Sequence, residues 1–279
     1  MNIGIRLHDT AGETLAERLR GAKAQGFSCV HLAMQKAVPG FRMGDAPTLL
    51  TEELAGEVRE TLDAYGMSCA VLGCYLNLAT PDEEAYAHTL EIYRAHLRFA
   101  RWLGALTVGT ETGAPNTAYR SEPACWTDEA LSLFIRRVTP VVRWAEEEGV
   151  PLAIEPVCRH IVSTPERAER VLAAVDSPML QIILDTVNLL TPANHRQRDA
   201  LVAESERRFG ERIRVLHLKD YRVVPGKTDV VACACGTGEM DYTALLRLAD
   251  RRPGIPMTLE NTTPENAEAA RLCLEGWQR

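Results

Sequence analysis

Short apolar runs alternate with longer amphipathic stretches along the whole chain. The apolar runs are rich in Val, Ile, Leu and Cys, a composition typical of parallel strands that are buried on both faces. We predict strands at residues 3–7, 29–33, 69–74, 106–109, 152–154, 180–184, 213–218 and 256–259.

The stretches between these strands carry the signals of capped helices. The segment TLAERLRGAKAQG (14–26) begins with Thr and ends with Gly, residues favoured at helix N-caps and just beyond helix C-termini. Segments 51–66, 127–149 and 164–175 have similar starts, and in the last of them Pro follows the capping Thr. We predict a final helix over 263–278.

Eight strand candidates, each followed by a helical stretch, predict a (β/α)8 TIM barrel of the α/β class. A doubly wound sheet is the alternative, but it usually has a glycine-rich first turn. The first turn here reads RLHDTAGET and contains no GxGxxG. Because no linker, repeat or change of composition divides the chain, we expect one domain, 1–279.

Composition and charge restrict the kinds of molecule that the protein could bind. The chain is 46% hydrophobic and 25% charged, and its formal net charge of -7 argues against nucleic acid, whose binding needs a basic surface. No apolar run approaches the length of about 18 residues that a membrane span requires. No basic and apolar leader is visible, so we expect a cytoplasmic protein acting on a small molecule. A homo-oligomer is compatible with the sequence.

The eight cysteines do not indicate disulfides or zinc. They contain no CxxC pair, and most of them lie in apolar runs, where Cys behaves as a small hydrophobic residue. Cys233 and Cys235 are the only close pair. We expect structural thiols.

Polar residues recur where four consecutive strands end. In a TIM barrel the active site is built at the carboxyl ends of the strands. The fifth to eighth strands end at Glu155, Asp185, His217 and Glu260, respectively. Each alone has a simpler explanation, as a helix cap, a core histidine or a surface acid. Their equivalent positions in successive repeats indicate a shared centre.

Three carboxylates in one small cavity need a neutralising partner, and a divalent cation is the most direct one. Three oxygen ligands and one nitrogen ligand favour Mn²⁺, with Mg²⁺, Co²⁺ or Zn²⁺ as alternatives. A cation that holds a carbonyl and a neighbouring hydroxyl oxygen acidifies the C–H between them and stabilises the enediolate that follows.

The chain resembles the xylose isomerase-like TIM barrels known as sugar phosphate isomerases/epimerases. The resemblance extends over nearly the whole chain and is most specific at IEP (Glu155), LDTVN (Asp185), HLKD (His217) and TLEN (Glu260), with GTGEMDY between the last two. In the ketose 3-epimerases of this family the corresponding residues bind the metal, and the two Glu residues also transfer protons. The resemblance therefore implies a metal site of Glu155, Asp185, His217 and Glu260.

The same resemblance implies that Glu155 and Glu260 are the catalytic acid/base pair. One carboxylate removes the proton and the other returns it from the opposite face, which gives epimerisation. Return to the neighbouring carbon gives aldose–ketose isomerisation. The expected activity is thus a metal-dependent isomerase or epimerase acting on a sugar or related polyol.

The chain departs from the 3-epimerases at two substrate positions. Asn188 stands where they carry His, and Ile161 stands where they carry a second Glu. We expect His160 to replace part of this function, with Arg159 beside it and Asn188 facing the substrate.

Further residues are predicted to line the sugar pocket. Lys219 either pairs with Asp220 or orients a substrate oxygen, and Arg222 resembles the substrate Arg of the epimerases at a spacing one residue shorter. Strand ends also bring Arg6, His8, His31, Gln35, Tyr75, Asn77 and Glu111 to the barrel mouth. We interpret GTGEMDY as a loop at the mouth, because it lacks the GK[ST] of a phosphate loop.

Three other functions compete. A lyase of the inosose dehydratase, dehydroshikimate dehydratase or oxo-glycoside-eliminating kind starts with the same proton abstraction and then expels a leaving group, for which His160 could act as the acid. A DNA-repair endonuclease shares the barrel but needs extra His ligands that Asn188 and the DVV at Asp229 do not supply. A non-catalytic sugar-binding barrel is disfavoured by the four intact metal positions.

Overall fold

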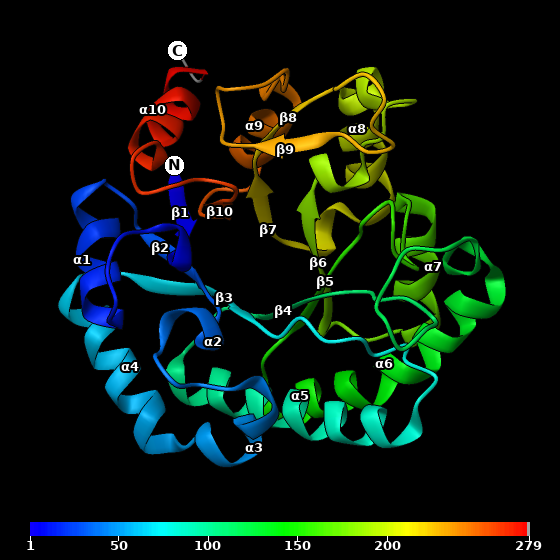
Figure 1. Ribbon diagram of the computed structural model, residues 1–279, viewed down its shortest axis with the longest axis horizontal. Coiled ribbons are helices and arrows are strands. Elements are labelled where there is room, and N and C mark those ends of the chain that lie inside the picture. The colour runs from blue at the N-terminus through cyan, green and yellow to red at the C-terminus, as the bar shows by residue number, and fades with distance from the viewer. Residues whose placement is uncertain (278–279) are drawn as a thin grey trace.

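The structure, a computed structural model, describes residues 1–277. In this part of the chain, eight parallel strands close into a barrel and helices surround it (Figure 1). The barrel strands are β1 (Asn2–Arg6), β2 (Cys29–Leu32), β3 (Ser68–Gly73), β4 (Val108–Glu111), β5 (Leu152–Glu155), β6 (Leu180–Asp185), β7 (Ile213–Leu218) and β10 (Pro256–Leu259). The predicted TIM barrel is confirmed.

Strand positions agree with the apolar pattern to within one or two residues. β7 and β10 have the predicted bounds, whereas β4 begins two residues later and continues to Glu111. β5 and β6 each extend one residue further, to Glu155 and Asp185. The acidic residues at these ends are thus held by the sheet itself.

The main helices follow the capping signals. They are α1 (Leu15–Ala24), α4 (Glu52–Ala64), α5 (Glu83–Leu103), α6 (Asp128–Glu148), α7 (Pro165–Val175), α8 (Arg198–Phe209), α9 (Thr243–Asp250) and α10 (Ala267–Trp277), with the short α2 (Met34–Ala37) and α3 (Ala46–Leu49) between β2 and α4. A Thr side chain accepts a backbone N–H at the start of α1, α4, α6 and α7.

The last helix starts later than predicted. The N–H of Thr263 donates to the side chain of Asn266 in a turn, and α10 begins only at Ala267. The predicted end of this helix at Gln278 lies outside the described residues.

Apolar side chains fill the inside of the barrel. Val71, Ala153, Ile183 and Val215, from β3, β5, β6 and β7, form a buried layer, as expected for a TIM barrel interior. A second, larger core packs the strands against the helices. An apolar layer therefore closes the barrel beneath its mouth.

The strand register sets functional side chains at matching heights. Asp185 on β6 pairs with His217 on β7, and Glu111 on β4 pairs with Glu155 on β5. Because neighbouring parallel strands end at the same rim, these side chains meet at the mouth.

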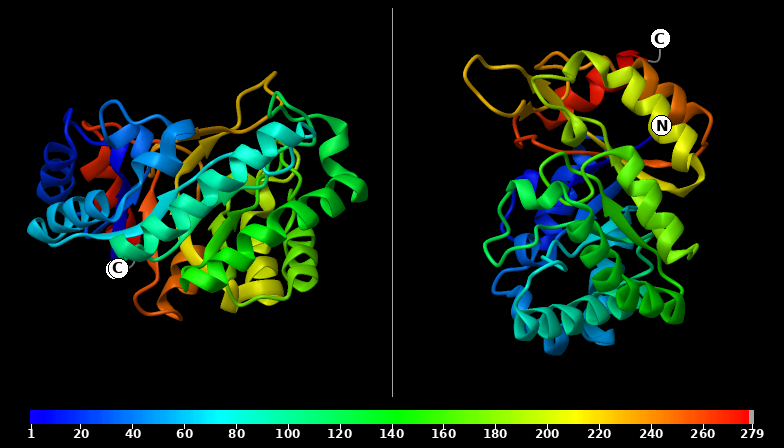
Figure 2. Two further views of the ribbon diagram at one scale, coloured as in Figure 1. Left: turned by 90° about the horizontal axis from the view of Figure 1, so that it is seen from below. Right: turned by 90° about the vertical axis from the view of Figure 1, so that its right-hand side faces the viewer.

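A small hairpin extends from β7. It consists of β8 (Asp220–Arg222) and β9 (Val231–Cys233), which pair antiparallel, and the segment between them projects outward (Figure 2). The GTGEMDY loop that follows is anchored by Asp220, whose carboxylate accepts the N–H groups of Gly236, Gly238 and Met240.

The eight cysteines carry free thiols, as expected. Within residues 1–277, no helix has the length and apolar character needed to cross a membrane.

Candidate active site and metal centre

The four strand-end residues come together in the barrel mouth. Glu155, Asp185, His217 and Glu260 are between 1% and 7% exposed. Nδ1 of His217 lies 3.3 Å from Oε2 of Glu155 and 3.2 Å from Oε1 of Glu260. The imidazole of His217 thus lies between Glu155 and Glu260, the two carboxylates that the family resemblance implies as the proton-transferring pair.

Lys219 joins the same cluster. Its Nζ lies 2.9 Å from Oδ2 of Asp185 and 3.1 Å from Oε2 of Glu260. Side chains alternate along an extended strand, so Lys219 follows His217 into the mouth while Asp220 turns to the opposite side. Of the two alternatives for Lys219, a pair with Asp220 is therefore wrong, because Lys219 pairs with Asp185 and Glu260 while Asp220 binds the glycine-rich loop.

The charges in the cluster compensate one another. Burial opposes protonation of His217, but Glu260 and Glu155 raise its pKa to about 9. Burial likewise opposes the charge of Lys219, yet Asp185 and Glu260 raise its pKa. Burial alone would raise the pKa of Glu260, but the positive charges of Lys219 and His217 lower it. The pKa of Asp185 rises to about 6 because burial outweighs Lys219.

These residues fit a divalent cation. Among the described residues, neither ring nitrogen of His217 has a hydrogen-bond partner, although both are buried. Two ligands that share an ion through bonds of about 2.1 Å lie about 3.0 to 3.4 Å apart at right-angled or tetrahedral geometry. The 3.2 and 3.3 Å separations around Nδ1 match that range.

Potential ligand atoms form two overlapping groups. One group contains Glu155, Asp185 and His217, and the other contains His31, His217 and Glu260. Within each group the atoms lie within 4.8 Å of one another.

Asn188 holds two of the acidic residues in place. Its Nδ2 donates to Oε1 of Glu155 at 2.6 Å, and its backbone N–H donates to Oδ1 of Asp185 at 3.0 Å. Asp185 therefore also serves as the local cap considered from the sequence. The side chain of Asn188 lines the cavity described next.

A cavity of about 400 Å³ opens above the cluster. Of the residues predicted to contact substrate, Arg159, Asn188, Lys219, His8, Tyr75 and Glu111 line it, as do Arg6, His31 and Gln35.

Two predicted substrate residues lie elsewhere. Within residues 1–277, Arg222 is not part of the cavity wall, and its guanidinium donates to the carbonyl oxygen of Thr237 in the GTGEMDY loop. Its contact with substrate stays a prediction, which this cavity does not support. The ring of His160 lies behind Glu111, with Nδ1 3.6 Å from Oε2, and Arg159 takes the place at the wall.

Tyr119 is a residue that the sequence did not reveal. Its hydroxyl donates to Oε2 of Glu111 at 3.2 Å, and its ring packs 5.3 Å from that of His160. Tyr119 has a φ of 52°, which residues other than Gly seldom adopt, and the loop sequence NTAYR gives no signal for it. Burial and then Glu155 raise the pKa of Glu111 to about 7.

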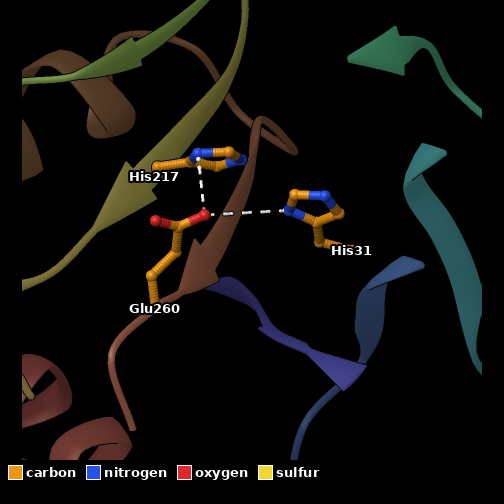
Figure 3. Close-up of side chains that lie close together, drawn as sticks. All are labelled: His31, His217 and Glu260. Carbon is orange, nitrogen blue, oxygen red and sulfur yellow. Dashed lines mark ion pairs between the residues drawn. The ribbon is translucent and has the colours of Figure 1, made fainter. Parts of the chain in front are cut away.

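His31 is closer to the centre than the sequence indicated (Figure 3). Its ring lies 5.2 Å from the ring of His217, and its Nδ1 lies 3.8 Å from Oε1 of Glu260. Burial and then His217 lower the pKa of His31 well below its ordinary value, so the imidazole is neutral.

Comparison with known proteins identifies the family. The family profile described as "Xylose isomerase-like TIM barrel" matches residues 19–276. The chain therefore belongs to the xylose isomerase-like TIM barrel family, as the sequence motifs implied. No curated protein matches the chain.

Solved structures share the fold at low identity. A 3-keto-D-glucoside 4-epimerase, YcjR, from E. coli superposes with a TM-score of 0.73 at 19% identity, covering 100% of this chain and 99% of that one. A probable 3-DHS dehydratase, AsbF, from Bacillus anthracis gives 0.75 at 13% identity, covering 100% and 99%. An IolI protein with a bound zinc atom gives 0.73 at 17% identity, covering 100% and 96%.

Proposed function

We propose that the protein is a divalent-metal-dependent isomerase or epimerase acting on a sugar or related polyol. The observation that carries this proposal is the placement of Glu155 and Glu260 on either side of His217, each with an oxygen within 3.3 Å of the same ring nitrogen. The epimerase among the structural neighbours supports the reaction class, and the bound zinc of IolI supports a metal.

Glu155, Asp185, His217 and Glu260 would hold the cation, with Mn²⁺ favoured by three oxygen ligands and one nitrogen ligand. Bound there, the cation would supply positive charge next to a carbonyl and a hydroxyl oxygen of the substrate and so acidify the C–H between them.

The chain itself supplies the proton transfers. Glu155 is the last residue of β5 and Glu260 directly follows β10, so a substrate held between them would have one carboxylate on each face. One removes the proton and the other returns it, while Asn188 fixes the orientation of Glu155. Lys219 and Arg6 provide positive charge around Glu260, at 3.1 and 3.9 Å.

Hydrogen exchange in heavy water tests this function. A panel of ketoses, inososes and 3-oxo-glycosides is incubated with the protein and Mn²⁺, and deuterium uptake at carbon is measured by mass spectrometry. We expect uptake with Mn²⁺, none with EDTA, and none in Glu155→Gln or Glu260→Gln. Glu91→Gln, at an exposed position of α5, is the matched control and should exchange normally. Failure of exchange across the panel would favour the non-catalytic binding barrel.

A lyase is the second candidate, and Glu111 is the observation that favours it. Elimination needs a proton donor next to the leaving group. His160 does not fit that role, because burial and then Arg159 lower its pKa to about 4 and leave it neutral. Glu111, with a pKa raised to about 7 by burial and Glu155, keeps a proton that it could donate. Elimination products in the same panel would identify the lyase.

A further inference from the structure

The ring of His31 lies in a site built around it. It stacks between the rings of Tyr75, at 5.6 Å, and His217, at 5.2 Å. Gly73 on β3 leaves room for it, because a Cβ at that position would lie 2.8 Å from Nε2 of His31. The orientation of this imidazole is therefore fixed from three sides.

This buried side chain has no hydrogen-bond partner within residues 1–277. His31 is 2% exposed, and both its ring nitrogens are unpaired. Burying polar nitrogens without partners is costly, and such groups call for an explanation. Packing alone would favour an apolar side chain at a position buried to this extent.

Nδ1 of His31 points at Glu260 (Figure 3). The separation from Oε1 is 3.8 Å, longer than a hydrogen bond. Two ligands of one ion with bonds of about 2.1 Å each can lie up to about 4.2 Å apart when they are opposite each other. The 3.8 Å separation is thus compatible with a shared ion and too long for a direct bond.

The same carboxylate oxygen faces the second imidazole. Oε1 of Glu260 lies 3.2 Å from Nδ1 of His217, whereas Oε2 is turned to Lys219. Nδ1 of His31 on β2 and Nδ1 of His217 on β7 therefore face the same oxygen, Oε1 of Glu260, which does not pair with Lys219.

We propose that His31 is a further protein ligand of the cation, so that the site has two imidazole nitrogens. The inference rests on the metal dependence in the proposed function. A second imidazole shifts the preference of the site away from Mg²⁺ and toward borderline transition metals such as Co²⁺ and Zn²⁺.

Metal affinity and spectroscopy test the proposal on the whole protein. His31→Phe keeps an aromatic ring between Tyr75 and His217 and removes the nitrogen ligand. We expect its Co²⁺ affinity, measured by titration calorimetry, to fall by at least about 10-fold, since loss of even outer-shell partners costs that much. His96→Phe replaces another buried imidazole, in α5 and bonded to the carbonyl oxygen of Ile92, and should bind Co²⁺ like the wild type.

A second measurement does not depend on the variant. The Cu²⁺-loaded wild type should show electron spin-echo modulation from two imidazoles, and one imidazole would overturn the proposal. Unchanged Co²⁺ affinity in a folded His31→Phe protein would also overturn it, while leaving the proposed function intact. If the wild type binds neither Co²⁺, Zn²⁺ nor Mn²⁺, the proposed function fails together with this inference.

Discussion

The ammonium group of Lys219 lies 3.1 Å from Oε2 of Glu260, while Oε1 of the same carboxylate faces His217. Lys219 also lies 2.9 Å from Oδ2 of Asp185 and is 6% exposed. A single buried cation thus pairs with two acids of the proposed metal site. It reduces the repulsion among the carboxylates before any ion binds.

Lys219→Met removes this internal counter-charge. In EDTA we expect the free energy of unfolding to fall by about 3 to 5 kcal/mol, the usual cost of leaving buried partners of an ion pair unpaired. Mn²⁺ should restore part of the loss, because the ion compensates the same carboxylates. Urea unfolding monitored by circular dichroism measures both values. Lys227→Met, at an exposed position of the hairpin segment, is the control. An equal loss with and without Mn²⁺ would contradict the reasoning.

Asn188→Ala tests whether the orientation of the Glu155 carboxylate matters for metal binding, because the carboxylate itself stays in place. The variant loses the 2.6 Å hydrogen bond to Oε1 of Glu155, whereas the backbone bond to Asp185 remains available. We expect Mn²⁺ affinity to fall by about 10-fold or more, as for other outer-shell partners of metal ligands. Calorimetric titration with Mn²⁺ measures the change.

Asn194→Ala is the matched control for this loop. Asn194 bonds to the backbone at Leu189 and Thr191 and does not bond to Glu155. Its replacement should lower stability and leave the affinity for Mn²⁺ unchanged. If both variants lose affinity equally, the loop as a whole and not the Asn188 amide orients Glu155.

The sequence predicted the barrel because the barrel strands are apolar runs and four of the helices, α1, α4, α6 and α7, follow a capping Thr. It also predicted that the four strand-end residues meet at the barrel mouth, because the carboxyl ends of parallel strands lie at the same rim. It did not reveal which side of the chain Lys219 and Asp220 would face, because that depends on where β7 ends and the hairpin begins.

Other parts of the site depend on contacts between distant segments. Tyr119 reaches Glu111 through a left-handed backbone conformation in a loop without a sequence signal. His31 looked like one of several residues at the mouth, and its central place depends on Gly73, more than forty positions along the chain, leaving room for its ring. Arg222 stands one residue closer to His217 than the substrate Arg of the epimerases does, and its guanidinium bonds to the loop at Thr237.

Gly109→Ala tests the packing beneath the mouth. A Cβ at this position of β4 would lie 2.5 Å from Cγ1 of Val71 and 2.8 Å from Cδ1 of Ile183, both in the interior layer. We expect a loss of about 1 to 3 kcal/mol in the free energy of unfolding, the usual cost of overpacking a core. Gly56→Ala in α4 meets nothing within 4 Å and should stabilise by about 0.5 to 1 kcal/mol through helix propensity. Urea unfolding of the two variants should therefore give shifts of opposite sign.

The raised pKa of Glu111 predicts that the free energy of unfolding depends on pH. Burial and then Glu155 raise its pKa from the ordinary 4.5 to about 7, so the folded protein binds this proton more tightly than the unfolded chain does. The resulting stabilisation is complete below pH 4.5 and is lost as the pH rises through 7, at up to about 1.4 kcal/mol per pH unit. Glu111→Gln carries no such proton and should escape this loss.

Asp185 and His217 also titrate, so the quantity to compare is the difference in unfolding free energy between each variant and the wild type at each pH. From pH 5 to pH 8, in EDTA, we expect Glu111→Gln to gain about 2 kcal/mol of unfolding free energy relative to the wild type. Glu91→Gln, exposed on α5, should show a constant difference over the same range. A constant difference for Glu111→Gln as well would mean that Glu111 is ionised in the folded protein throughout. The carboxyl group would then be unable to donate a proton to a leaving group, and the lyase alternative would lose its support.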